Sequence, residues 1–207
     1  ILKKKNSNNS VKRSFIKKLY IKLFDSDQRL DSYPFFTHRK VEADLIPYIY
    51  KINTMKLDKT HDARFGNGIC SDFNFFDNNS PIIRHLAKDL INIMEQAVKS
   101  KIFIIESFFN IIGAGSGATI HNHNSNLDKL LKLSNQKYSF FYYISLGDQN
   151  CTEPGILKLY NNKKQIIKKI LPSDGKIIIT RANQLHSAAY NGKTDRIMIG
   201  VNFYSLA

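Results

Sequence analysis

The second half of the chain is a series of short apolar runs separated by turn signals. The runs are KIFIIESFFNII (101–112), ATIHNHN (118–124), YSFFYYISL (138–146), GILKLY (155–160), KQIIKKIL (164–171), KIIIT (176–180) and RIMIGVNFY (196–204). Turns that contain glycine or proline lie at 113–117, 147–148, 154–155, 172–175 and 191–192. Many short β-branched and aromatic strands at this spacing are typical of a β-sandwich or barrel. We therefore expect residues 103–207 to form a β-rich core, with the preceding helices packed outside it.

Two helices are predicted before this core. Residues 81–99 repeat apolar side chains with a helical period. Ser80 can cap this helix, and Pro81 stands where a first-turn proline is tolerated. Residues 14–24 (SFIKKLYIKLF) can form a short basic amphipathic helix. Such a helix can make peripheral contact with a membrane or bind a partner, although it more often packs against its own domain.

The composition is that of one folded domain after a basic arm. Of the 207 residues, 43% are hydrophobic and 12% are aromatic, which is enough for one substantial core. We expect a basic tail with the short helix at 1–30 and a single domain at 31–207. No apolar run is long enough to cross a bilayer, and the opening ILKKKNSNNS has no secretory signal. The first residue is Ile1 and not Met, so we expect a processed or excised piece.

The two cysteines indicate the compartment. Cys70 and Cys151 are far apart in the chain and form no CxxC or other metal-binding pattern. This usage fits a reduced, cytoplasmic protein best, with one disulfide as the alternative.

The net charge of +14 favours an anionic partner, but it is unevenly distributed. Residues 1–30 contain nine basic and two acidic residues, which is half of the excess. The simplest interpretation is a solvated basic arm. Nucleic acid is not expected, because the aromatic residues form no recognisable RNA-binding motif. In the β-rich half, Lys158 and Arg181 would suit an anionic substrate. Nothing in the pattern indicates an oligomeric state.

Three of the six histidines lie in the β-rich half and can form a metal site. His121 and His123 are two residues apart, and positions i and i+2 of a strand project from the same face, so both imidazoles can reach one ion. His186 can supply a third ligand from a neighbouring strand. Three ligands leave coordination positions open for catalysis by a redox metal, and zinc also accepts such a set. The alternative is that the strand histidines simply form hydrogen bonds.

The span from Phe108 to Tyr204 resembles the 2-oxoglutarate/iron(II) oxygenases, especially their prolyl-hydroxylase-like branch. Within that superfamily it is most similar to a group of bacterial and phage proteins that carries HxH. The order of motifs carries the resemblance: a glycine-rich turn before HxH, then YSFFYYIS, PGILKLY, a P-x-x-G turn at 172–175, the distal His186, and Arg196 ten residues later. The segment RFGNGICSDFNFF (64–76) adds a looser similarity.

The resemblance implies a fold, a reaction and a set of site residues. The fold would be mainly β with flanking helices, a double-stranded β-helix (jelly roll, cupin-like). His121, His123 and His186 would hold Fe(II). Arg196 would bind the far carboxylate of the co-substrate 2-oxoglutarate, and Tyr143 could add a hydroxyl donor. The activity would be hydroxylation of an unactivated C–H bond in a small-molecule or peptide substrate, with release of succinate and CO₂.

The chain departs from the family pattern at the second ligand. The family usually has a carboxylate there, in HxD or HxE, where this chain has His123. We favour three histidines, with Asp128 as the alternative ligand, although Asp128 lies past HxH in a predicted loop.

Several of the candidate residues also allow an ordinary structural interpretation. Arg196 could be a surface residue, and Tyr143 could simply pack in the core. On the strand face of Arg196, Gly200 would leave room for a ligand. Asn202 could be a polar contact within the pocket or a satisfied core amide, and we favour the second interpretation.

Two other functions fit the same residues. The first is a three-histidine, cupin-type dioxygenase that uses no 2-oxoglutarate, which the missing carboxylate favours and Arg196 opposes. The second is a non-catalytic β-sandwich binding module, which would hold no stoichiometric metal.

Overall fold

The computed structural model describes residues 33–56 and 68–206. Every element described below belongs to the unit that begins at Pro34. The basic tail predicted at 1–30 and the amphipathic helix predicted at 14–24 lie outside the described residues. Their structure and the domain boundary remain predictions.

Most of the regular structure in the described residues is β-strand, as the sequence predicts. The strands are β1 (Phe35–His38), β2 (Met55–Lys56), β3 (Ile69–Cys70), β4 (Ile102–Ile112), β5 (Ser116–His121), β6 (Lys137–Ser145), β7 (Leu157–Tyr160), β8 (Ile166–Ile170), β9 (Lys176–Arg181), β10 (Leu185–Tyr190) and β11 (Arg196–Ser205). The helices are α2 (Leu45–Ile49), α3 (Pro81–Val98) and α4 (Asn126–Leu130), with a 3₁₀ turn η3 (Phe75–Asp77).

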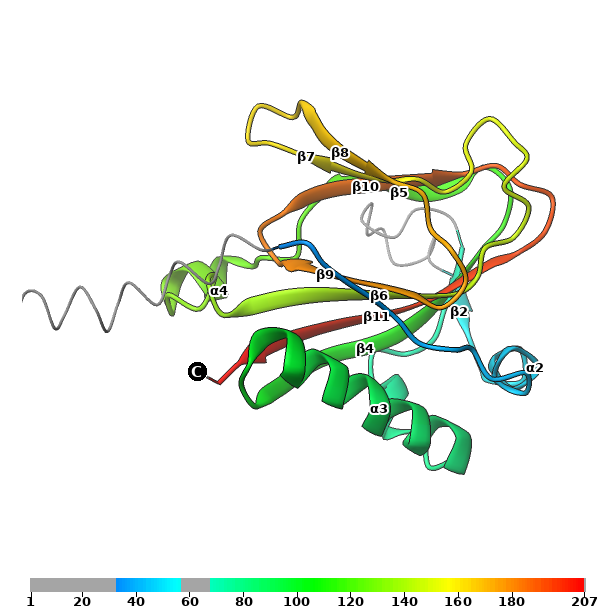
Figure 1. Ribbon diagram of the computed structural model, residues 1–207, viewed down its shortest axis with the longest axis horizontal. Coiled ribbons are helices and arrows are strands. Elements are labelled where there is room, and N and C mark those ends of the chain that lie inside the picture. Colours follow the sequence, from blue (N-terminus) through cyan, green and yellow to red (C-terminus); the bar gives the residue numbers. More distant parts are fainter. Residues whose placement is uncertain (1–32, 57–67, 207) are drawn as a thin grey trace, which may run out of the picture. The chain divides into compact units, whose positions relative to one another are not determined.

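These strands form two antiparallel sheets that lie face to face (Figure 1). The larger sheet has the order β1-β9-β6-β11-β4-β3-β2, and the smaller sheet has the order β5-β10-β7-β8. Between them, Phe141 of β6 and Ile178 of β9 pack in one cluster with Leu157 of β7 and Ile170 of β8. Full burial of such a side chain contributes about 1.5–3 kcal/mol, so the contact between the sheets is a main source of stability. The predicted two-sheet β architecture is confirmed.

The long helix α3 lies outside the larger sheet, as expected (Figure 1). Its buried face consists of apolar side chains at helical spacing, including Ile83, Leu86, Leu90 and Met94. Ser80 occupies the N-cap position, but its side chain makes no capping hydrogen bond, so the predicted side-chain cap is not formed. None of the helices in the described parts of the chain is long and apolar enough to cross a membrane.

The apolar runs in the sequence did not mark four of the strands, although a strand was expected to carry His186. β1 and the two short strands β2 and β3 lie before the helix, and β10 contains LHSAAY, which has no β-branched residue. Tertiary pairing overrides this low propensity, since β10 is hydrogen-bonded to β5 on one side and to β7 on the other. This placement is what brings His186 into the candidate site.

Candidate metal centre

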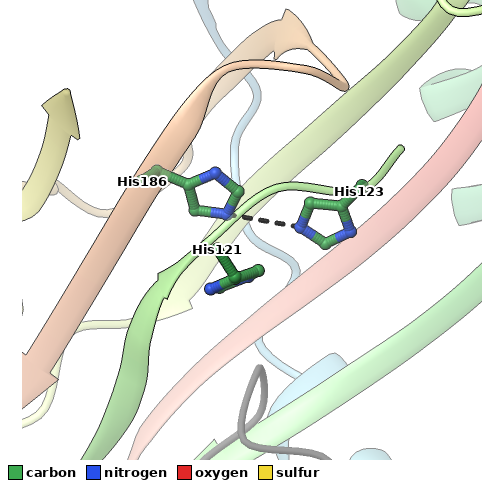
Figure 2. Close-up of side chains that lie close together, drawn as sticks. All are labelled: His121, His123 and His186. Carbon is green, nitrogen blue, oxygen red and sulfur yellow. Dashed lines mark hydrogen bonds between the residues drawn. The ribbon is translucent and has the colours of Figure 1, made fainter. Parts of the chain in front are cut away.

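Three histidines converge between the two sheets (Figure 2). His121 is the last residue of β5, and His186 of β10 lies directly opposite it in the antiparallel register. One ring nitrogen from each of His121, His123 and His186 lies within 4.8 Å of the other two. His123 and His186 are only 8% and 4% exposed. The structure therefore brings the three predicted ligands together.

His123 reaches the cluster by a different route from the one that the sequence suggested. The strand β5 ends at His121, so the two side chains are not aligned by regular strand geometry. Instead, the backbone N–H of His123 donates to the carbonyl of Ala182, 2.8 Å away, just after β9. This bond holds His123 across from His186, and the Nε2 atoms of these two rings are 3.3 Å apart (Figure 2).

Backbone carbonyls fix the protonated nitrogen in two of the rings. His121 Nδ1 lies 2.6 Å from the carbonyl oxygen of Thr119, and His186 Nδ1 lies 2.9 Å from that of Gln184. Because a carbonyl oxygen only accepts, both Nδ1 atoms carry hydrogen, and each Nε2 holds a lone pair. Burial, and then the nearby His121, lower the pKa of His186 to about 3. A neutral imidazole held in this way is suited to binding a metal.

His123 is bonded through Nδ1 to a side chain and not to a carbonyl. Asn202 Nδ2 donates to His123 Nδ1 at 3.1 Å and to Glu106 Oε2 at 2.8 Å. Asn202 Oδ1 accepts from Ser139 Oγ at 2.9 Å. Asn202 is thus a satisfied buried amide, as interpreted, but it also contacts a histidine of the site. No local sequence pattern indicates this contact, because 79 residues separate Asn202 from His123.

Asp128 has a structural role elsewhere. It lies outside the histidine group and forms a capping box with Ser125 at the start of α4. Its carboxylate accepts from Lys137 Nζ at 2.9 Å and from the Tyr204 hydroxyl. Burial would raise the pKa of Asp128, but the hydrogen bonds from Tyr204, Lys137 and Ser125 lower it below the usual range. These contacts occupy the carboxylate that was considered as an alternative ligand.

Arg196 begins β11 and is buried, with 2% of its surface exposed. Its guanidinium carbon lies 5.0 Å from the ring centroid of Tyr143, a cation–π distance. Burial lowers the pKa of Arg196, and attraction to the Tyr143 hydroxyl partly offsets this. Within 33–56 and 68–206, no carboxylate forms an ion pair with Arg196, and its Nε has no hydrogen-bond partner. The surface interpretation of Arg196 is therefore wrong.

Arg196, Tyr143 and the three histidines line one cavity. The other walls are mostly small or apolar and include Phe108, Ile112, Ala118, Leu157, Ala188 and Met198. Asn110 also lines the cavity; it is 6% exposed, and its Oδ1 has no hydrogen-bond partner. Asn110 was not among the residues predicted for the site. The signal that could have identified it is a lone amide within the apolar run FFNII.

Two glycines shape this cavity. Gly155 has a φ of +80°, and a Cβ there would overlap Arg196 Nη1, so only glycine lets this loop pack against the guanidinium. A Cβ at Gly200 would lie 2.5 Å from the ring of Phe108. The space at Gly200 is thus filled by Phe108, and the expectation that it leaves room for a ligand is wrong.

The two basic residues considered for an anionic substrate do not line this cavity. Lys158 Nζ lies 3.4 Å from Glu153 Oε2. The guanidinium of Arg181 packs 4.7 Å from the ring centroid of Tyr138 and donates to the carbonyl of Asn135. Neither residue supports an anionic substrate at this site.

The sequence matches no protein family model and no curated protein. It can therefore be compared with known proteins only through solved structures of similar fold.

Several solved structures share the fold at low sequence identity. A prolyl hydroxylase from Trichoplax adhaerens, in complex with a peptide fragment of hypoxia inducible factor, superposes with a TM-score of 0.61 and 12% identity, covering 98% of this chain and 94% of that chain. HygX from Streptomyces hygroscopicus, with nickel, 2-oxoglutarate and hygromycin B bound, has a TM-score of 0.62 and 10% identity, with 87% of each chain covered. A viral collagen prolyl hydroxylase from Paramecium Bursaria Chlorella virus-1, in its 2-oxoglutarate complex, has a TM-score of 0.58 and 12% identity, covering 86% of this chain and 99% of that chain. The chain therefore has the double-stranded β-helix fold of the 2-oxoglutarate/iron(II) oxygenases.

Proposed function

We propose that this protein is an iron(II)- and 2-oxoglutarate-dependent oxygenase whose metal is held by His121, His123 and His186. One observation carries the proposal: a buried guanidinium, Arg196, lines the same cavity as the three histidines and forms no ion pair with a described carboxylate. A buried charge is costly unless it is paired. The cavity therefore suits a ligand with one end for a metal and a carboxylate at the other end.

The three histidines fit a divalent metal. Their ring nitrogens converge within 4.8 Å, and two of the rings have Nδ1 committed to carbonyl oxygens. Imidazole ligands suit iron, and fewer than six protein ligands leave positions for a co-substrate and oxygen. Since the set contains no carboxylate, the protein contributes three neutral donors.

The lining of the cavity suits a carboxylate such as that of 2-oxoglutarate. The planar guanidinium of Arg196 can donate two parallel hydrogen bonds to a carboxylate. The ring of Tyr143 packs against that guanidinium, and its hydroxyl can add a third donor. Asn110, whose Oδ1 lacks a partner, is a further polar group of this chain that can contact a ligand in the same cavity. The small and apolar walls exclude water and keep these charge interactions strong.

The reaction that we propose is hydroxylation of a C–H bond. With iron and 2-oxoglutarate bound, O₂ would be the oxidant: one oxygen atom would form the new hydroxyl group and the other would enter succinate, with release of CO₂. The chain's own residues hold the metal, fix the co-substrate and exclude water. Similar structures carry a hypoxia inducible factor peptide in one case and hygromycin B in another, so we propose a peptide or small-molecule substrate without choosing between them.

A three-histidine dioxygenase that does not use 2-oxoglutarate is the second candidate. The absence of a carboxylate from the three-histidine cluster favours it. Buried Arg196 opposes it, because such an enzyme has no need of a buried cation in the cavity.

The test is anaerobic titration of the full chain with iron(II) and then 2-oxoglutarate, followed in the visible spectrum. A metal-to-ligand charge-transfer band is expected in the wild type. It is expected to be absent in His186→Ala, which loses a ligand, and in Arg196→Ala, which loses the carboxylate partner. Matched controls are His85→Ala, at a side chain that is 70% exposed, and Arg181→Ala, outside the cavity; both should keep the band.

The outcomes separate the candidates. Iron binding without a band and without competition by 2-oxoglutarate would favour the second candidate. No metal binding at all would contradict both and favour a non-catalytic binding module. With the band established, succinate formation in the presence of peptide and small-molecule pools is the assay for substrate.

A further inference from the structure

A line of polar side chains crosses the larger sheet and ends on His123. Asn202 of β11 lies opposite Glu106 of β4 and opposite Ser139 of β6 in the strand register. Residues that are directly opposite on neighbouring strands project from the same face. The three side chains are accordingly hydrogen-bonded to one another, with Asn202 in the middle and His123 beyond it.

Glu106 determines which way the Asn202 amide faces. An ionised carboxylate only accepts hydrogen bonds, so the nitrogen of Asn202 must point toward Glu106 Oε2, 2.8 Å away. The same nitrogen lies 3.1 Å from His123 Nδ1. Ser139 imposes no direction, because a hydroxyl can donate or accept.

The amide direction in turn determines the tautomer of His123. Since Asn202 Nδ2 donates to Nδ1, this nitrogen must hold the lone pair, and the hydrogen lies on Nε2. That hydrogen then fits the 3.3 Å contact with His186 Nε2, which holds a lone pair because its Nδ1 donates to Gln184. A continuous chain of donors and acceptors therefore runs from Gln184 through both rings to Glu106.

This tautomer conflicts with metal binding at His123. A metal on Nε2 moves the hydrogen to Nδ1, where it would face the N–H of Asn202. If the amide turned over, its oxygen could accept from Nδ1, but that oxygen would then face the carboxylate of Glu106. His121 and His186 have no such conflict, because their Nδ1 atoms face carbonyl oxygens.

We infer that Asn202 and Glu106 form an amide switch with two positions. In the first position, Asn202 is a positioning residue that holds His123 in the tautomer that opposes metal binding. Metal binding turns the amide over into the second position and releases Glu106. This rests on the proposed function only in making the three histidines a metal site. The half-buried position of Glu106 permits the release, since its carboxylate can exchange Asn202 for water. A metal must therefore break two hydrogen bonds of His123 before it gains the third ligand.

The first test reads the tautomers directly, in the metal-free full chain at neutral pH, by long-range ¹H–¹⁵N correlation of the imidazole rings. His121 and His186 are expected as Nδ1–H tautomers and His123 as the Nε2–H tautomer. On loading with zinc, His123 is expected to change to Nδ1–H, and the side-chain amide signals of Asn202 are expected to shift. An Nδ1–H tautomer of His123 in the metal-free wild type overturns the inference.

The second test reverses the polarity of the switch. The double variant Glu106→Gln with Asn202→Asp keeps the total charge but gives His123 Nδ1–H a permanent acceptor. It is expected to show Nδ1–H at His123 without metal and to bind cobalt(II) at least about tenfold more tightly than the wild type. Changes of this size in metal affinity are typical when a hydrogen-bonded partner of a metal ligand is altered. Equal or weaker cobalt binding overturns the inference.

A matched control separates the switch from general loosening of Asn202. Ser139→Ala removes the bond to Asn202 Oδ1 but leaves the donor to His123. Its His123 tautomer and cobalt affinity are expected to match the wild type, and a change equal to that of the double variant overturns the inference. Because the tautomer is measured without 2-oxoglutarate, a missing charge-transfer band would contradict the proposed oxygenase and leave the switch standing.

Discussion

Gly155 offers a way to disturb the proposed co-substrate contact without removing the charge that makes it. Its φ of +80° is in the left-handed region, and an added Cβ would overlap Arg196 Nη1. The Gly155→Ala change should therefore strain the backbone and push the guanidinium away from its position beside Tyr143. Backbone strain and displacement of the guanidinium need to be separated, because strain alone would not change the affinity for 2-oxoglutarate.

The chain offers a matched control in Gly115. Its φ of +76° is almost the same, but a Cβ there would have nothing within 4 Å. Each alanine should lose about 1–2 kcal/mol of unfolding free energy to the left-handed conformation. Only Gly155→Ala should also disturb Arg196. Loss of one charge-assisted hydrogen bond costs about 1.5–3 kcal/mol, which is a factor of about 10 to 100 in the dissociation constant for 2-oxoglutarate.

The assay is urea unfolding of both variants, followed by anaerobic titration of the iron(II)-loaded proteins with 2-oxoglutarate. Gly115→Ala is expected to keep the wild-type affinity, and Gly155→Ala is expected to lose at least about tenfold. If both variants unfold more easily but bind 2-oxoglutarate equally well, Arg196 does not hold its carboxylate, and the assignment of this residue is refuted.

Three further predictions concern stability. Asp128→Asn should lower the free energy of unfolding in urea by about 3–5 kcal/mol, because it leaves Lys137 buried without its partner. A urea midpoint equal to that of the wild type would contradict this prediction. The pKa of Asp128 is lowered in the folded state, so its contribution is fully present above the ordinary carboxyl pKa of about 3.9 and is lost as the pH falls through the folded value. The gap in unfolding free energy between wild type and variant should therefore close in acid, and a gap that stays constant would exclude the ion pair. Leu90→Ala on the buried face of α3 should cost about 2–5 kcal/mol with unchanged cobalt affinity, and altered affinity would show that the helix supports the site.

The sequence predicted the fold well wherever apolar periodicity and turn residues agreed. The runs that became β4, β6 and β11 contain many β-branched and aromatic residues, so pattern and propensity indicate the same structure. β10 was different, because LHSAAY has low strand propensity and is held by neighbours on both sides. His186 was expected on a strand next to the HxH segment, and β10 confirms this, but no apolar run marked that strand in the sequence.

The site residues show a similar division. His121 and His186 could be chosen from spacing and resemblance, since a histidine is recognisable as a potential ligand in any context. The burial of Arg196 could not be predicted from its flanking residues, because Asp195 beside it suggests a solvated turn. The loop that packs against the Arg196 guanidinium contains Gly155, which is distant in the sequence. Asn110 was hidden for the opposite reason, since one amide among apolar residues is common in a strand.

How readily a histidine ring binds a metal depends on the atom that faces its second ring nitrogen. The fold determines that atom more than the sequence motif does. For His121 and His186, that atom is a carbonyl oxygen two residues earlier in the chain, so local backbone geometry sets the tautomer. For His123, it is the amide nitrogen of Asn202, 79 residues away, which Glu106 orients from a third strand. An HxH motif therefore identifies which rings can meet, whereas the group facing each Nδ1 determines the tautomer in which each ring meets a metal. In this chain, His123, which stands where the resembled oxygenases usually have a carboxylate, is also the ring whose Nδ1 faces a donor.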